Sequence, residues 1–305
     1  MSEGLRLTFR PMVESDLSVS RYIAHEAMEA LERSQGVAAE PWMPADPWAQ
    51  RHLLQTDAEG AWIAELNGVA VGYSMALVRG DIWYLSQLFV QPDQHAHGIG
   101  RELLRRAHAY GRDRGARVFS VVASTSRVAH GLYMQAGMFA IGVGYRMSGP
   151  LEPLLALPGR DARLEDARAH QDEIATLDRE VFGAERRQDH AIYLDDTRWP
   201  GGSSSFVLMR GASLSGYAYA VADGGFIAPM AAYDPADQAP LLRAAAAWLT
   251  DRGVSTGNLF VLSHNRTLMN ALFDAGWRSR HWSFLLTSEP FAKFDRYHPA
   301  GASLL

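Results

Sequence analysis

The 305-residue chain contains no cysteine, and Lys293 is its only lysine. The missing thiols exclude disulfide bonds, thiolate metal sites and a cysteine nucleophile. The sequence also lacks an apolar run of about 18 residues, the length that a membrane-spanning helix needs. Its first residues lack the basic and apolar segments of a secretory signal. We therefore expect no membrane contact and a cytoplasmic location.

Positive charge is not concentrated in any block of the sequence. The formal net charge is −5, and the basic residues are almost all dispersed arginines. A protein that binds nucleic acid needs a basic face to neutralise phosphates, so we expect no nucleic-acid partner. Hydrophobic residues make up 48% and charged residues 21% of the chain. These fractions and the length are typical of a globular protein with two domains.

The first half of the sequence alternates segments of strand and helix character. Branched and aromatic runs indicate strands, apolar residues at helical spacing indicate helices, and Asn67-Gly68 indicates a hairpin turn. The order is a hairpin meander followed by a βαβ unit, which predicts a mixed α/β sheet. The predicted strands are 5–10, 62–66, 69–79, 82–90, 118–123 and 138–147. The predicted helices are 14–33, one that starts at Asp46-Pro47, 98–114 and 128–136.

The second half repeats this order after a stretch rich in proline and glycine at 149–159. Ser126-Arg127 precedes Ala136-Gly137 at the same spacing at which Asn265-Arg266 precedes Ala275-Gly276. We therefore predict one duplicated fold, with domains at 1–150 and 151–305. The predicted strands of the second half are 206–210, 214–222, 226–232, 259–261 and 281–286, and the predicted helices are 239–251 and 267–275.

Residues 90–104 combine a strand end, a short loop and a helix opened by Gly98 and Gly100. The start of a helix presents unpaired N–H groups and the positive end of its dipole, which suit a phosphate. Glycine lets a pyrophosphate approach the main chain closely. The third glycine of the dinucleotide fingerprint is replaced by Leu103, and the Walker lysine is absent. By themselves the two glycines fit a simple tight turn equally well.

Two motifs together resemble those of the GNAT acyltransferase superfamily. The loop resembles its pyrophosphate motif, in which a strand ending in Val-x-Pro precedes Arg/Gln-x-x-Gly-x-Gly/Ala. Residues 126–138 resemble its second motif, Asn-x-x-Ala-x-x-Leu-Tyr-x-x-x-Gly-Phe. The resemblance covers most of residues 5–147. It implies two tandem GNAT-like folds, a catalytic one at 1–150 with an acetyl-CoA site and a degenerate one at 151–305.

The resemblance also assigns roles to single residues. The N–H of Val90 would polarise the thioester carbonyl and stabilise the oxyanion. Tyr133 would give a proton to the leaving thiolate, although a Leu-Tyr pair also fits simple packing. The residues that the resemblance places at the cofactor are Leu88, Phe89, Val90, His95, Ala96, His97, Gly98, Ile99, Gly100, Arg101, Ser126 and Tyr133.

Three of these positions depart from the family pattern. His95 stands where the family has arginine or glutamine, and His97 where a basic residue is common. Because histidine has an ordinary pKa near ~6.5, we expect cofactor binding to weaken as the pH rises. Ser126 replaces the usual asparagine. His95 and His97 could instead form a metal pair, but no third ligand is evident near them, so we predict no metal site.

The acceptor side is less defined by the sequence. The resemblance places the acceptor near the segment between the first two helices, where Trp42 and Trp48 could form an aromatic wall. A proline-stiffened loop held to the core by the same two side chains is the alternative. Glu26 and Glu29 are candidate general bases, although ordinary solvated helix positions fit them better. A water relay or a residue from elsewhere is the alternative. The base is left unassigned.

The second half has lost the features that mark a cofactor site. Residues 233–242 join strand to helix without either glycine, and Leu272 stands at the place of Tyr133. Asp237 near the helix start would repel a phosphate. Residues 177–183 resemble a segment of degenerate C-terminal domains in tandem GNAT proteins. We expect a structural or acceptor-site role for this half, although Asn265 restores the asparagine missing at Ser126.

The sequence thus predicts an N-acetyltransferase. It would move an acetyl group from acetyl-CoA to a primary amine of a small molecule, by direct attack in a ternary complex. We expect a monomer or homodimer. Two alternatives stay open, a non-catalytic acyl-CoA-binding regulatory module and a protein or peptide N-acetyltransferase.

Overall fold

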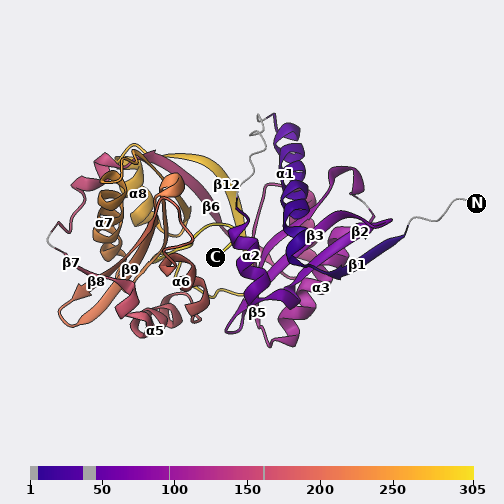
Figure 1. Ribbon diagram of the computed structural model, residues 1–305, viewed down its shortest axis with the longest axis horizontal. Coiled ribbons are helices and arrows are strands. Elements are labelled where there is room, and N and C mark those ends of the chain that lie inside the picture. Colours follow the sequence, from indigo (N-terminus) through magenta and orange to yellow (C-terminus); the bar gives the residue numbers. More distant parts are fainter. Residues whose placement is uncertain (1–5, 37–45, 96, 161) are drawn as a thin grey trace, which may run out of the picture. The chain divides into compact units, whose positions relative to one another are not determined.

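The computed structural model describes residues 6–36, 46–95, 97–160 and 162–305. The chain forms two compact units, which are drawn in indigo to magenta and in rose to yellow in Figure 1. The first unit holds the residues up to Val121 together with Ser126–Met138, and the second holds Val122–Thr125 and Phe139–Leu305. Each unit is described by itself below.

The first unit is built on a mixed sheet in which neighbours in sequence are neighbours in space. Strands β1 to β4 pair antiparallel, and β5 pairs parallel with β4. Asn67 and Gly68 both have positive φ, at 52° and 82°, as a two-residue hairpin turn between β2 and β3 requires. The strands are β1 (Leu7–Pro11), β2 (Ala61–Leu66), β3 (Val69–Arg79), β4 (Ile82–Val90) and β5 (Val118–Ala123).

Helices cover both faces of this sheet. Helix α3 contacts β2, β3 and β4, and its Ile99 and Leu103 pack with Val90 in one apolar cluster. Helix α1 contacts β3 and β4, and α2 contacts β3. The helices are α1 (Leu17–Ser34), α2 (Trp48–Thr56), α3 (Ile99–Asp113) and α4 (Arg127–Gln135), with short 3-10 turns η1 (Glu14–Asp16), η2 (Ala58–Gly60) and η3 (Pro92–Gln94).

A buried carboxylate ties three elements of the first unit together. Asp57, just after α2, accepts hydrogen bonds from the Tyr110 hydroxyl of α3 at 2.7 Å and from the Val78 N–H of β3 at 2.9 Å. Its other oxygen pairs with Arg79 at 2.8 Å, and both side chains are 1% exposed. The pair therefore fixes the end of α2 against the sheet from inside the core.

The second unit repeats this plan around a larger sheet. Its strands follow the order β12-β6-β11-β10-β9-β8-β7, with β13 beside β10, and β10 and β11 pair parallel. They are β6 (Phe139–Pro150), β7 (Arg163–Glu165), β8 (Ser203–Arg210), β9 (Ser213–Val221), β10 (Phe226–Ala232), β11 (Thr256–Leu262), β12 (Arg278–Thr287) and β13 (Tyr297–His298).

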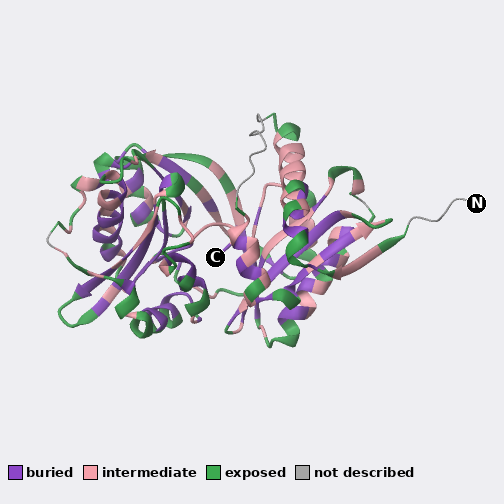
Figure 2. Cartoon of the chain, viewed as in Figure 1, coloured by how far each residue is buried: buried purple, intermediate pink, exposed green. Residues whose placement is uncertain are grey.

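The helices of the second unit enclose its core, whose buried residues are purple in Figure 2. Helix α7 packs on β8, β9 and β10, and α5 contacts β9 and β10. The helices are α5 (Gln171–Val181), α6 (Arg187–Leu194), α7 (Gln238–Thr250) and α8 (Arg266–Asp274), with 3-10 turns η4 (Glu152–Ala156), η5 (Ala167–Ala169), η6 (Asp223–Gly225) and η7 (Pro235–Asp237).

Strand β6 pairs with strands that lie far away in the sequence. It runs antiparallel between β11 and β12, and Tyr145 faces Val261 on one side and Trp282 on the other. A Cβ at Gly144 would meet the Phe260 ring at 2.2 Å, so glycine is needed for this close approach. The compact units differ from the predicted boundary at residue 150 by this strand and by Val122–Thr125, which both belong to the second unit.

Candidate functional site

A β-bulge divides strand β4 into two parts. Its register against β3 shifts where Met75 faces Gln87 and Ala76 faces Leu85, which leaves Ser86 as the extra residue of a β-bulge. Before the bulge, β4 pairs with β5 over Ile82–Leu85. After it, β4 continues to Val90 beyond this pairing. The last residues of β4 thus offer a strand edge to an extended ligand.

The main-chain groups of Val90 point toward that edge. Gln91 donates its N–H to the Val71 carbonyl of β3 at 2.9 Å, and Val90 faces Gly72. Since successive residues of an antiparallel strand turn their hydrogen-bonding groups to opposite sides, the N–H and C=O of Val90 face away from β3. The Val90 N–H therefore faces the open edge of β4.

Helix α3 begins directly beyond this edge, at a glycine. Gly98 is its N-cap residue with φ 75°, and no side chain caps the helix there. An L residue is strained at this φ, although a Cβ would meet nothing within 4 Å. A Cβ on Gly100 would lie 3.8 to 3.9 Å from Leu88, Val90 and Leu132. The first turn of α3 thus presents its N–H groups beside an apolar wall.

The two loop histidines use their rings within the loop. His95 Nε2 lies 3.1 Å from the Val90 carbonyl oxygen, and His97 Nδ1 lies 3.3 Å from that of Gln94. A carbonyl can only accept, so these nitrogens carry the protons. Arg101 is exposed on the first turn of α3, and the Ile99 side chain is buried, which leaves its main chain for a ligand. Ala96 lies outside the described residues.

Helix α4 brings Ser126 and Tyr133 into the first unit. Ser126 is the N-cap residue, and its hydroxyl accepts from the Ala129 N–H at 3.4 Å. The serine at the place of the family's asparagine therefore serves the helix itself. Tyr133 is 5% exposed, and burial raises its pKa, so its hydroxyl keeps its proton at neutral pH. Leu132, which the sequence analysis passed over, belongs to the wall around Gly100 and is part of the same Leu-Tyr pair.

The opposite face of β4 carries polar side chains that sequence reasoning did not bring together. Gln87 accepts from the Tyr73 hydroxyl at 2.8 Å and from Gln50 of α2 at 3.3 Å. Gln91 donates to Glu26 of α1 at 2.9 Å. Phe89 lies between them and packs against Tyr73, with ring centroids 5.8 Å apart. Alternation along a strand is the sequence signal that places these residues opposite Val90.

The two predicted acceptor tryptophans are only partly accounted for. Trp48 is the first residue of α2 and is half-buried. Trp42 lies outside the described residues. Glu29, the other predicted base candidate, forms an exposed ion pair with Arg33 at 2.7 Å. Of the two glutamates named from the sequence, Glu26 is therefore the one bound to the end of β4.

Comparison with known proteins identifies the family of residues 23–138. The model of the Acetyltransferase (GNAT) family matches residues 23–138, a range that holds β4, the loop, α3 and α4. This chain contains a GNAT acetyltransferase domain. An uncharacterized N-acetyltransferase of Methanocaldococcus jannaschii is 28% identical over 78 residues, which is 23% of this chain and 34% of that protein. The match thus spans about a third of the length of this relative.

Solved structures extend the likeness to the whole fold. A candidate acetyltransferase from Pyrococcus horikoshii has a TM-score of 0.75 at 16% identity and covers 99% of this chain and 98% of its own. A GCN5-related N-acetyltransferase from Sphaerobacter thermophilus gives 0.66 at 18%, over 95% and 98%. A tandem GNAT protein from the clavulanic acid biosynthesis pathway gives 0.61 at 17%, over 93% and 99%. The chain therefore has the tandem GNAT fold, as the repeat predicts.

In the second GNAT-like fold, internal side-chain contacts occupy the helix starts that correspond to the candidate site of the first fold. Asp237 is the N-cap residue of α7, and it accepts from Arg210 at 2.5 Å and from the Ser215 hydroxyl. Asn265 is fully buried, caps α8 through the Leu268 N–H at 3.1 Å and donates to Gln238 at 2.6 Å. Asn265 matches the asparagine of the GNAT motif, and its side-chain amide therefore forms its hydrogen bonds within the second unit.

A buried ion pair of Asp178 and Arg186 lies between α5, α6 and β9 of the second GNAT-like fold. Asp178 accepts from Arg186 at 3.1 Å, from His190 at 2.8 Å and from the Tyr217 hydroxyl at 2.7 Å. Arg186 also donates to the Tyr297 hydroxyl at 2.6 Å. Gly216-Tyr217 matches Gly72-Tyr73 in the sequence repeat, so this network includes the tyrosine that corresponds to Tyr73.

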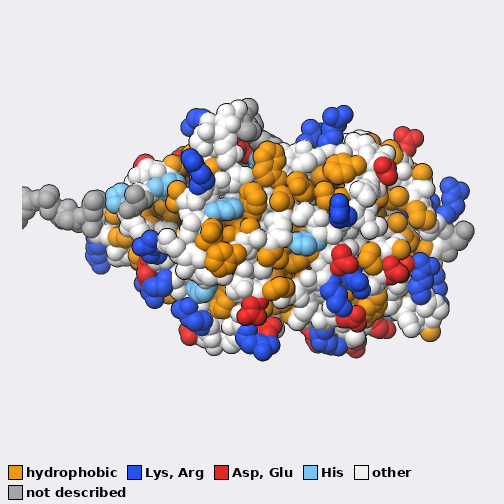
Figure 3. Space-filling view, turned by 180° about the vertical axis from the view of Figure 1, so that it is seen from behind, with side chains coloured by type: hydrophobic (Ala, Val, Ile, Leu, Met, Phe, Trp, Pro, Cys, Tyr) orange, Lys and Arg blue, Asp and Glu red, His pale blue; other side chains and the backbone are white. Residues whose placement is uncertain are grey.

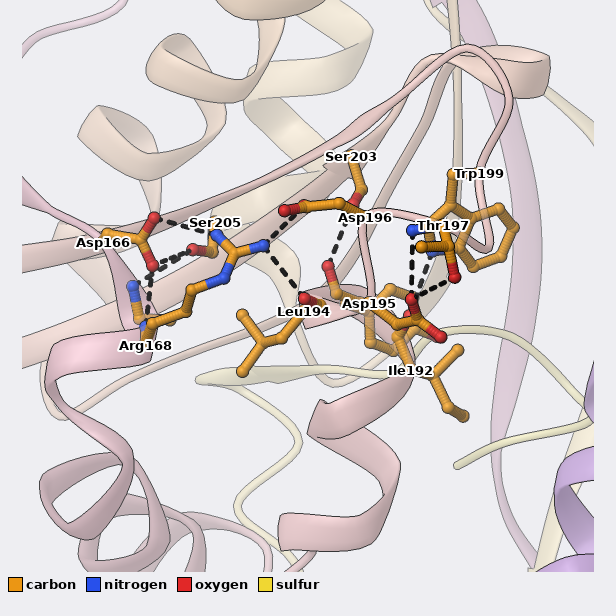
Figure 4. A network of polar contacts seen from close by, with 12 residues as sticks. Asp166, Arg168, Ile192, Leu194, Asp195, Asp196, Thr197, Trp199, Ser203 and Ser205 are labelled. Atoms are coloured by element: carbon orange, nitrogen blue, oxygen red, sulfur yellow. Dashed lines mark hydrogen bonds and ion pairs between the residues drawn. The ribbon is translucent and has the colours of Figure 1, made fainter.

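The segment after α6 is tied down by a second network, shown in Figure 4. Arg168 binds Asp166 at 3.0 Å and the Leu194 carbonyl at 2.9 Å. Asp195 accepts from the N–H of Thr197 at 3.0 Å, and Trp199 donates to the Ile192 carbonyl at 3.1 Å. These bonds hold the connection between α6 and β8 against its own unit.

Charges on the surface are mixed in sign. On the face seen in Figure 3, basic and acidic side chains alternate along the edge of the molecule. Within the described ranges, no three His, Asp or Glu side chains gather as a metal ion would need. A search of the same residues finds no helix that is both long and apolar enough to cross a membrane.

Proposed function

We propose that this GNAT protein is an N-acetyltransferase that moves the acetyl group of acetyl-CoA to a primary amine of a small molecule. The observation that carries the proposal is the end of β4, which runs past its pairing with β5 to a glycine-capped helix start. A pantetheine arm is extended and rich in amides, so it can add to such an edge as a strand does. A pyrophosphate suits the first turn of α3.

Two groups of the first unit would carry the chemistry in a ternary complex. The Val90 N–H stabilises the oxyanion that forms when the amine attacks the thioester carbon. Tyr133 gives its hydroxyl proton to the thiolate as the C–S bond breaks. Of the described residues, Leu88, Phe89, His95, Ser126 and residues 97–101 would contact the cofactor, and the rings of His95 and His97 hydrogen-bond within the loop.

We propose further that the second unit, 151–305 with β6 added, binds no acyl-CoA. The carboxylate of Asp237 stands at the start of α7, where a phosphate would need positive potential. Leu272, at the place of Tyr133, is fully buried and has no proton to give. The role of the second unit is then structural and not catalytic.

Calorimetry of acetyl-CoA binding tests the cofactor site with a matched pair of variants. Gly98 and Gly115 begin and end α3, both have φ between 75° and 77°, and a Cβ would meet nothing within 4 Å at either. Alanine therefore costs about 1–2 kcal/mol of strain at both. We expect Gly98→Ala to weaken acetyl-CoA binding at least about tenfold, and Gly115→Ala to leave it unchanged.

Equal affinity in both variants would place the cofactor elsewhere. A second assay follows thiol release with a panel of small amines. Release in the presence of an amine supports the transferase. Binding of acetyl-CoA without release for any amine would instead favour a regulatory acyl-CoA-binding module.

A further inference from the structure

The two faces of β4 differ in what they leave open to an incoming amine. Leu88 and Val90 face α3, where Ile99, Leu103 and their neighbours form a packed apolar cluster. That face has no room for an acceptor, because protein interiors are close-packed. A nucleophile that attacks a carbonyl held at Val90 must therefore come from the face that bears Gln87, Phe89 and Gln91.

The carboxylate of Glu26 lies on that face, next to the end of β4. Gln91, the residue after Val90, donates its side-chain amide to Glu26 Oε2 at 2.9 Å. Tyr22, one turn earlier on α1, also donates to Glu26, and this raises the pKa of the tyrosine. Glu26 is half-buried and is therefore shielded in part from solvent. Two donors from different elements fix its orientation.

The face of β4 near Glu26 carries the side-chain amides of Gln87 and Gln91. The Oε1 of Gln87 receives both Tyr73 and Gln50, which leaves the NH2 of Gln87 as a donor. Arg21 of α1 is the cation whose charge reaches Tyr73 on this face. Glu29, one turn beyond Glu26, is paired with Arg33 at the surface. A cationic group arriving at β4 would thus meet Glu26 as its counter-charge.

We propose that Glu26 binds the ammonium group of the acceptor and that Gln91 positions it. The substrate class is then a cationic primary amine whose remaining groups are neutral hydrogen-bonding ones, such as an amino alcohol or amino sugar. This inference rests on the proposed transferase function and names its acceptor. An α-amino acid is disfavoured, because its carboxylate would lie close to Glu26.

The proton balance of the step is simple. The bound R–NH3+ loses one proton through Glu26 to water, and the free amine attacks the thioester carbon. The C–N bond forms and the C–S bond breaks. The thiolate takes the Tyr133 proton, and the second nitrogen proton returns to the tyrosine by way of water. The products are the amide, free thiol and one proton in solution.

Steady-state kinetics with a matched pair of variants test the assignment. The probes are acetyl-CoA with amino alcohols, amino sugars and α-amino acids, and thiol release is the readout. Glu26→Gln should raise the KM of the best amine at least about tenfold and leave the KM of acetyl-CoA within about twofold. Glu29→Gln makes the same charge change on the same helix and should alter neither. Gln91→Met should shift the amine KM in the same direction as Glu26→Gln.

The outcomes separate the two proposals. An active wild type whose amine KM is the same in Glu26→Gln and Glu29→Gln would overturn the role of Glu26 and leave the transferase standing. Selective loss of amine affinity in Glu26→Gln supports the role. A wild type that releases no thiol with any amine would remove the transferase function and, with it, the acceptor assignment.

Discussion

Single residues in the first unit divide the work between shaping the loop and meeting the cofactor. His95 and Ser126 both satisfy main-chain groups of their own segment. Gly98 lets the chain turn into α3, and Val90 and Tyr133 are the groups to which we assign the proposed chemistry. Each loop histidine thus forms a hydrogen bond within the loop, and the pH dependence of cofactor binding stays a prediction.

Tyr133→Phe tests the acid at this scale. Phenylalanine keeps the ring in its buried place and removes only the hydroxyl proton. We expect kcat to fall by about 10²-fold, because the thiolate then leaves without a proton donor. Acetyl-CoA affinity by calorimetry and the unfolding midpoint should stay at wild-type values. A kcat within about threefold of wild type would assign Tyr133 to packing alone.

At the scale of elements, polar contacts inside the core decide where the helices sit. Asp57 joins α2, β3 and α3, and Glu26 meets β4 through Gln91. The first of these links is fully buried and the second is half open. The buried link therefore serves stability, whereas the open one is placed to meet a ligand.

Asp57→Asn measures the buried link. The asparagine keeps the shape but leaves Arg79 without its counter-charge, so we expect the free energy of unfolding to fall by about 3–5 kcal/mol. Glu29→Gln removes a partner of the exposed Arg33 and should cost less than about 0.5 kcal/mol. Urea unfolding followed by circular dichroism gives both values. A similarly small loss of unfolding free energy in both variants would show that the Asp57–Arg79 pair does not stabilise the core.

Over the whole molecule, buried titrating groups set the response to acid. Burial lowers the pKa of His298 to about 4, and burial with the nearby Arg112 does the same for His108. Both are neutral in the folded protein at pH 5, whereas an unfolded histidine with a pKa near ~6.5 takes up a proton. The folded state then binds fewer protons than the unfolded one, so stability rises with pH across this window.

The free energy of unfolding should therefore fall as the pH drops from about 6.5 to 4. His298→Gln keeps a donor for the Ile227 carbonyl, which His298 Nε2 meets at 3.0 Å, and removes the titration. We expect the free energy of unfolding of this variant to change by up to about 3 kcal/mol less over the window than that of the wild type. Denaturant unfolding at a series of pH values measures it. An unchanged slope would show that His298 is not protonated on unfolding.

Local patterns were enough to predict much of the fold. The bounds of β3, β4, β5 and β10 agree with the predicted ranges, because branched and aromatic runs there end at turn residues. Helices α5 and α6 were not predicted, and the partners of β6 were not foreseen. Its pairing joins Tyr145 to Val261 and Trp282, more than a hundred residues away, and no local pattern encodes such a contact.

The candidate site was predicted in position more than in detail. Spacing identified the loop and the helix start, but it could not show that His95 would turn to Val90 or that Ser126 would cap α4. Glu26 and Gln91 are 65 residues apart in sequence, so their hydrogen bond appears only in the folded chain. Trp42 stays a prediction.

The placement of β6 also governs the order in which the protein can assemble during synthesis. Its residues leave the ribosome well before those of β11 and β12, between which it lies. Domains made early usually fold early, at a synthesis rate of about 5–20 residues per second. Both edges of β6 therefore stay unpaired until the last quarter of the chain, which contains β11 and β12, has been synthesised. The nascent protein is therefore exposed to wrong strand pairing until translation is almost complete.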